Sequence, residues 1–125
     1  MNFSIGKFSQ MMDLSIYTLR YYEQLKLIVP ARKDNGQRYY SDEDAAWVQF
    51  IKRLKDTGMP VKEIQIYSEL RSQGDPTMPQ RMELLVKHRA ALKDEIARLQ
   101  DHLENLDNKI DYYRAEIIKQ RNPAA

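Results

Sequence analysis

The chain has 125 residues, of which 42% are hydrophobic and 30% are charged, and its formal net charge is +2. It contains no cysteine, which excludes disulfides, thiolate metal sites and thiol-based catalysis. No apolar run is long enough to span a membrane, and residues 1–7 do not resemble a signal peptide, so we expect a cytoplasmic protein with no membrane partner.

Charged residues are distributed unevenly along the chain. Basic side chains outnumber acidic ones in residues 1–40, whereas residues 75–125 carry both signs equally. The first pattern suits contact with phosphate groups, and the second is typical of a solvated helix. We therefore expect two domains with different tasks, residues 1–74 and residues 75–125.

The first 25 residues predict two short helices joined by a tight turn. Ser4 can cap a helix over about residues 5–11, and Ser15 can cap a second helix over residues 16–25. Between them, Asp13 is a residue type that tolerates unusual backbone angles. Two helices joined by so short a turn form a helix-turn-helix.

A hairpin is predicted directly after the second helix. The Asn-Gly pair at residues 35–36 lies between two short extended runs, which is a strong signal for a tight β-turn. A hairpin in this place is a wing. It offers Lys33, Arg38 and Tyr39 as polar contacts, while Tyr40 is expected to pack inward.

The second helix has one face that suits DNA. Tyr17, Arg20 and Tyr21 follow the i, i+3, i+4 spacing, so they lie together and offer a bidentate cation and two hydroxyls. The alternative is that the tyrosines belong to the core and Arg20 is an ordinary surface cation. We favour DNA contact for this face and a core position for Tyr22, because the helix follows a turn of the right length.

Residues 41–74 predict two further helices. Ser41 and Asp44 form a capping-box pattern at the start of the first, and Gly58 ends it. Pro60 suits the first position of the next helix, which ends near residue 74.

A single long helix is predicted for residues 77–121, with a capping box between Thr77 and Gln80. Positions that alternate in steps of three and four along it are apolar, with Arg89 as the one charged residue, and this is the heptad pattern of a coiled coil. One interpretation is a helix buried on its own domain, but the remaining chain is too short to cover it. We therefore expect a dimer with a seam that includes Leu85, Leu92, Ile96, Leu99, Leu103, Leu106, Ile110 and Tyr113.

Residue patterns for catalysis or metal binding are missing from the sequence. His88 and His102 are 14 residues apart in the sequence with no second histidine or cysteine near either, whereas a zinc site needs three or four close ligands. No pair of nucleophile and base and no glycine-rich phosphate loop occurs. We expect neither an enzyme nor a cofactor.

Three segments resemble one known family. Residues 18–23 read TLRYYE, residues 38–41 read RYYS, and residues 50–54 read FIKRL. Together they resemble the DNA-binding domain of MerR-family transcriptional regulators, and the long helix resembles that family's dimerisation helix. The resemblance covers essentially the whole chain. Residues 54–59 and 67–75 resemble the small, aldehyde-responsive branch of the family (NmlR/AdhR-like).

The resemblance implies a mainly α-helical, winged helix-turn-helix regulator that dimerises through an antiparallel coiled coil. Such regulators bind pseudo-palindromic promoter DNA and distort its overlong spacer so that RNA polymerase can engage both recognition elements. With the residues argued above, the expected DNA-binding set is Ser15, Tyr17, Thr18, Arg20, Tyr21, Lys33, Arg38 and Tyr39.

One position departs from the aldehyde-responsive branch of the family. A cysteine commonly occupies the place that Arg53 holds here, so thiol-based sensing is not expected. The alternative function for the whole chain is a coiled-coil adaptor that binds protein partners without reading DNA.

Overall fold

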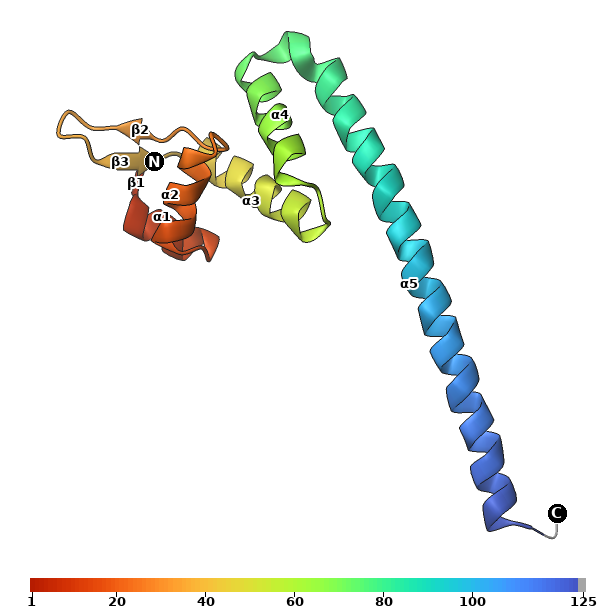
Figure 1. Ribbon diagram of the computed structural model, residues 1–125. Helices are drawn as coiled ribbons and strands as arrows, with labels where there is room; N and C mark the ends of the chain where they lie inside the picture. The colour runs from red at the N-terminus through yellow and green to blue at the C-terminus, as the bar shows by residue number, and fades with distance from the viewer. Residues whose placement is uncertain (124–125) are drawn as a thin grey trace. The chain divides into compact units, whose positions relative to one another are not determined.

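The computed structural model describes residues 1–123, and helices account for most of them (Figure 1). A three-stranded antiparallel sheet of order β1-β3-β2 accompanies the helices. The predicted mainly helical fold, with a wing and a long C-terminal helix, is confirmed. In chain order the elements are β1 (Phe3–Ser4), α1 (Ile5–Met12), α2 (Ile16–Gln24), β2 (Ala31–Arg32), β3 (Arg38–Tyr40), α3 (Asp42–Asp56), α4 (Val61–Ser72), the 3₁₀ helix η1 (Asp75–Thr77) and α5 (Met78–Arg121).

The chain forms two compact units. The first comprises residues 1–86 and the second begins at residue 87, inside α5. Within residues 1–123, no helix is long and apolar enough to cross a membrane. The division of tasks between residues 1–74 and 75–125 stays a prediction.

The helix-turn-helix forms where the capping residues predict it. The Ser4 side chain accepts a hydrogen bond from the Lys7 backbone N–H, and the Ser15 side chain accepts one from that of Thr18. Asp13, in the turn, has the left-handed conformation with a φ of 53°. This conformation ends α1 and lets α2 begin three residues later.

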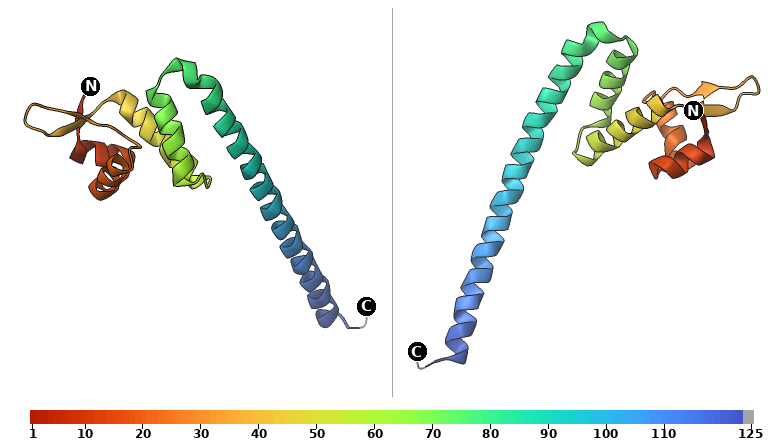
Figure 2. Two further views of the ribbon diagram at one scale, coloured as in Figure 1. Left: turned by 45° about the horizontal axis from the view of Figure 1, so that its top comes forward. Right: turned by 180° about the vertical axis from the view of Figure 1, so that it is seen from behind.

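The wing is a hairpin of β2 and β3, and β1 adds a third strand that the sequence did not predict. In the register, Phe3 pairs with Tyr40, and Tyr39 pairs with both Ser4 and Ala31. Gly36 has a φ of 85°, which glycine adopts without strain, and this allows the predicted tight turn. The turn projects beyond α1 and α2 in both views of Figure 2.

Aromatic packing joins the sheet to the helices. The rings of Phe8 and Tyr40 stack with centroids 4.3 Å apart, and both residues are buried. The inward positions predicted for Tyr22 and Tyr40 are confirmed. Burial, and next the nearby Glu23 carboxylate, raise the pKa of the Tyr40 hydroxyl above its ordinary value. Other large side chains that are fully buried include Leu19, Leu27, Val48, Ile51 and Ile64.

Two of the predicted helix starts need correction. Pro60 precedes α4 as its N-cap and is not its first residue. Thr77 and Gln80 do not form a capping box, because η1 leads directly into α5 and the Thr77 hydroxyl donates to the carbonyl oxygens of Leu70 and Gly74. The Ser41–Asp44 capping box at the start of α3 is confirmed.

Candidate nucleic-acid interface

Helix α2 presents its polar face to solvent. Tyr17 is 80% exposed and Tyr21 is 45% exposed, and Arg20 is exposed beside them. The opposite face of α2 is buried through Leu19 and Tyr22. The face predicted to contact DNA is therefore exposed to solvent, while the opposite face packs against the hydrophobic core.

The first turn of α2 carries two hydroxyl groups that are already paired. Ser15 Oγ lies 2.8 Å from Thr18 Oγ1, and either atom can be the donor. Ser15 Oγ also accepts the hydrogen bond from the Thr18 backbone N–H that caps the helix. The two side chains thus stabilise the start of α2. One hydroxyl proton and the unused lone pairs of the two oxygens remain available for hydrogen bonds at this end of the helix.

Residues of both the wing and α2 line one pocket. Its volume is about 340 Å³, and three cationic side chains line it, which makes it suited to an anionic group such as a phosphate. Four of the predicted DNA-binding residues line it, and residues 2–5 and Gln37, which the sequence did not suggest, complete it. The lining residues are Asn2, Phe3, Ser4, Ile5, Arg20, Lys33, Gln37, Arg38 and Tyr39.

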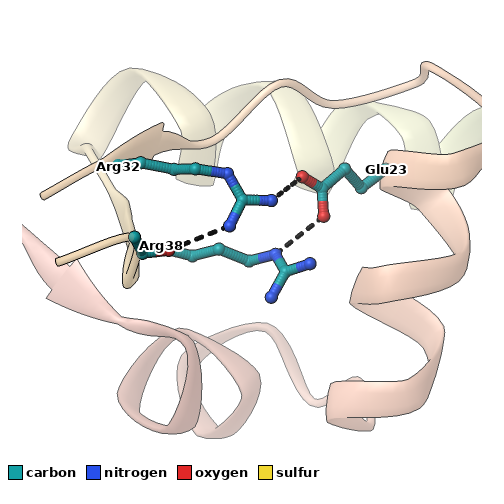
Figure 3. A network of polar contacts seen from close by, with 4 residues as sticks. Glu23, Arg32 and Arg38 are labelled. Atoms are coloured by element: carbon teal, nitrogen blue, oxygen red, sulfur yellow. Dashed lines mark hydrogen bonds and ion pairs between the residues drawn. The ribbon is translucent and has the colours of Figure 1, made fainter.

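An ion-pair network fixes the wing to α2 (Figure 3). The Glu23 carboxylate accepts a hydrogen bond from Arg32 Nη2 at 2.7 Å and another from Arg38 Nε at 2.7 Å. Arg32 Nη1 also donates to the Gly36 carbonyl oxygen at 3.0 Å. Neither Glu23 nor Arg32 was among the predicted site residues, because nothing in the sequence pattern pairs them.

The helix-turn-helix, the wing and part of the long helix match known sequence profiles. The profile described as "MerR HTH family regulatory protein" matches residues 3–70, and the profile described as "MerR, DNA binding" matches residues 45–110. The chain belongs to the MerR family. The resemblance drawn from the three sequence segments is confirmed.

Individual relatives of this chain support its membership of the MerR family. It is 33% identical to the uncharacterized HTH-type transcriptional regulator YyaN of Bacillus subtilis, over 94% of each chain. It is 37% identical to the HTH-type transcriptional regulator AdhR of Bacillus subtilis, over 71% of this chain and 64% of AdhR. The crystal structure of HiNmlR, a MerR-family regulator lacking the sensor domain and bound to promoter DNA, matches with a TM-score of 0.81 and 31% identity, over 92% of each chain. The expectation of a DNA-binding transcriptional regulator and not an enzyme is confirmed.

The predicted dimerisation residues of this MerR-family chain differ in their surroundings. Leu85 packs against the core of its own unit, and Leu92 is half-buried. The rest of the predicted seam is exposed along α5, between 47% and 62% per residue: Ile96, Leu99, Leu103, Leu106, Ile110 and Tyr113.

Within residues 1–123, no cluster of three or more acidic, histidine or cysteine side chains could hold a metal ion.

Proposed function

We propose that this MerR-family regulator binds pseudo-palindromic promoter DNA as a homodimer and distorts the spacer, so that RNA polymerase can engage the promoter. Residues 1–74 supply the DNA-binding domain and residues 75–125 the dimerisation helix. The regulator works in the cytoplasm, where bacterial promoter DNA is found.

The observation that carries the DNA contact is the pocket shared by α2 and the wing. Arg20, Lys33 and Arg38 come from separate segments and line the same 340 Å³ space. A phosphate of the DNA backbone would be held there, while Tyr17 and Tyr21 reach the groove from the exposed face of α2. Ser15 and Thr18, at the start of α2, and Tyr39, in the wing, complete the proposed contact surface.

The observation that carries the dimer is the exposed seam of α5. Ile96, Leu99 and Leu103 are each about half-exposed, and apolar surface of this kind gains roughly 25 cal/mol for each Å² that a partner removes from water. The heptad spacing fits a second copy of the same helix. An antiparallel pairing, as the family resemblance implies, completes the proposal.

Arg20→Ala is expected to weaken operator binding by about 1–3 kcal/mol, because a bidentate arginine contact to a base or phosphate is lost. The measurement is fluorescence anisotropy at fixed salt, with a duplex selected by the purified protein from random sequences. Arg98→Ala is the matched control, since it removes the same charge from an exposed position on α5. Equal affinities for Arg20→Ala and the wild type would show that this face of α2 does not dock on DNA.

Two substitutions of Ser15 separate its capping role from its proposed DNA contact. Ser15→Ala should lower the free energy of unfolding by about 1 kcal/mol, because α2 loses its N-cap. Ser15→Asp should keep the stability, because aspartate also caps, yet weaken DNA binding because its charge repels phosphate. Thermal unfolding and anisotropy measure the two effects, and unimpaired DNA binding by Ser15→Asp would remove Ser15 from the interface.

A further inference from the structure

Glu23 is an acidic side chain at the surface proposed to meet DNA. It lies in the last turn of α2, and its carboxylate holds Arg32 of β2 and Arg38 of β3, both at 2.7 Å. A carboxylate close to DNA phosphates is repelled by them, so its presence lowers affinity unless it serves the contact in another way.

The geometry leaves the phosphate-binding part of Arg38 free. Of the three Arg38 nitrogens, only Nε donates to Glu23, and Figure 3 shows one of the two Nη atoms pointing away from the carboxylate. Arg38 also lines the pocket that contains Arg20 and Lys33. Within residues 1–123, the two Nη atoms make no hydrogen bond, so they can donate to a phosphate oxygen in this pocket.

Arg32 has a different part in the same network. It bridges Glu23 and the Gly36 carbonyl oxygen, so one guanidinium joins α2 to the turn of the wing. Residues 31–37 are exposed, and the wing has few apolar contacts there to hold it in place. The network therefore restricts the motion of the hairpin before DNA binds. Without it, the hairpin would lose this conformational entropy on binding, so the network lowers the cost of binding and raises the affinity.

We propose that Glu23 is a positioning residue for DNA binding. It fixes the wing against α2 and aims the Nη atoms of Arg38 into the pocket with Arg20 and Lys33, without touching the DNA itself. This inference rests on the proposed function, because it takes that pocket as a phosphate site. It extends the interface to a residue whose own charge opposes DNA binding.

The substitution Glu23→Gln tests the proposal by the sign of its effect. Glutamine is close in shape, and losing the negative charge should strengthen binding if Glu23 is only a bystander. If Glu23 positions the wing, binding to the selected duplex should instead weaken about tenfold, as expected for loss of hydrogen bonds to charged groups. A scrambled duplex, bound through general electrostatics, should be bound as well as before or better.

Two comparisons make the test decisive. Glu69→Gln, which removes the same charge from an exposed position on α4, should leave the preference for the selected duplex unchanged. In a double-mutant cycle with Arg38→Gln, adding Glu23→Gln should cost less than it does in the wild type, because part of the Glu23 effect acts through Arg38 and the rest through Arg32. All four proteins of the cycle are measured below the lowest melting temperature, so a less stable variant remains informative.

The possible outcomes are distinct. Tighter binding of Glu23→Gln to both duplexes, or losses that add in the cycle, would overturn the positioning role. A wild-type protein that selects no duplex at all would instead refute the proposed function. Weaker binding to the selected duplex with a non-additive cycle supports the inference.

Discussion

A regulator carrying both Leu99→Glu and Leu103→Glu is expected to sediment as a monomer at micromolar concentration, where the wild type sediments as a dimer. Both leucines lie in the middle of the seam and are more than half exposed in the single chain. In the proposed coiled coil the new carboxylates would be buried against the partner. Unpaired buried charges are expensive, so the change should cost the dimer about 3–5 kcal/mol.

The matched control places two charges on the other side of the same helix. Ala97→Glu with Asn108→Glu adds the same net charge, and both positions lie roughly opposite the seam at 100° per residue. This variant should remain a dimer. A wild-type monomer at micromolar concentration, or a dimer that survives the leucine substitutions, would contradict the seam.

Local signals in the sequence were enough for most of the fold. Ser4, Ser15 and Ser41 each cap the helix that they were expected to cap, because an N-cap depends on the side chain and the three residues after it. The Asn-Gly turn of the wing is equally local, since Gly36 alone supplies the positive φ. These elements could be placed without knowledge of the rest of the molecule.

Features that depend on contacts across the chain were missed. Strand β1 has only two residues and exists because β3 pairs with it, so no periodicity could reveal it. Thr77 looked like an N-cap, but its hydroxyl donates to the carbonyl of Leu70 at the end of α4. A capping pattern cannot show that its hydroxyl is already used by another helix.

The candidate site likewise contains residues that local sequence patterns predict and one, Glu23, that depends on contacts between separate elements. The residues expected to touch DNA were chosen by residue type and helical spacing, and the structure brings Arg20, Lys33, Arg38 and Tyr39 to one pocket. Glu23 was recognised only as part of a family motif. Its contact with Arg38 spans 15 residues of sequence and joins a helix to a strand, and the spacing rules of single helices do not describe such a pair.

Inserting about five base pairs between the two half-sites of the selected duplex should abolish tight binding, because this rotates one half-site by about half a turn. A two-fold dimer presents its two copies of α2 at a fixed separation and on one face of the duplex. With the insertion, one copy would face the wrong side of the DNA. Affinity should fall toward that for unrelated DNA, roughly a thousandfold or more.

The control for this insertion is a duplex of the same length in which the five base pairs are added outside the half-sites. Its affinity should equal that of the original duplex, because the spacing between the half-sites is unchanged. Equal affinities for all three duplexes would mean that each α2 docks independently of its partner. The coiled coil would then tether two DNA-binding domains without setting their separation. The proposed distortion of the spacer would lose its mechanical basis, because bending requires the protein to hold the two half-sites at a fixed separation.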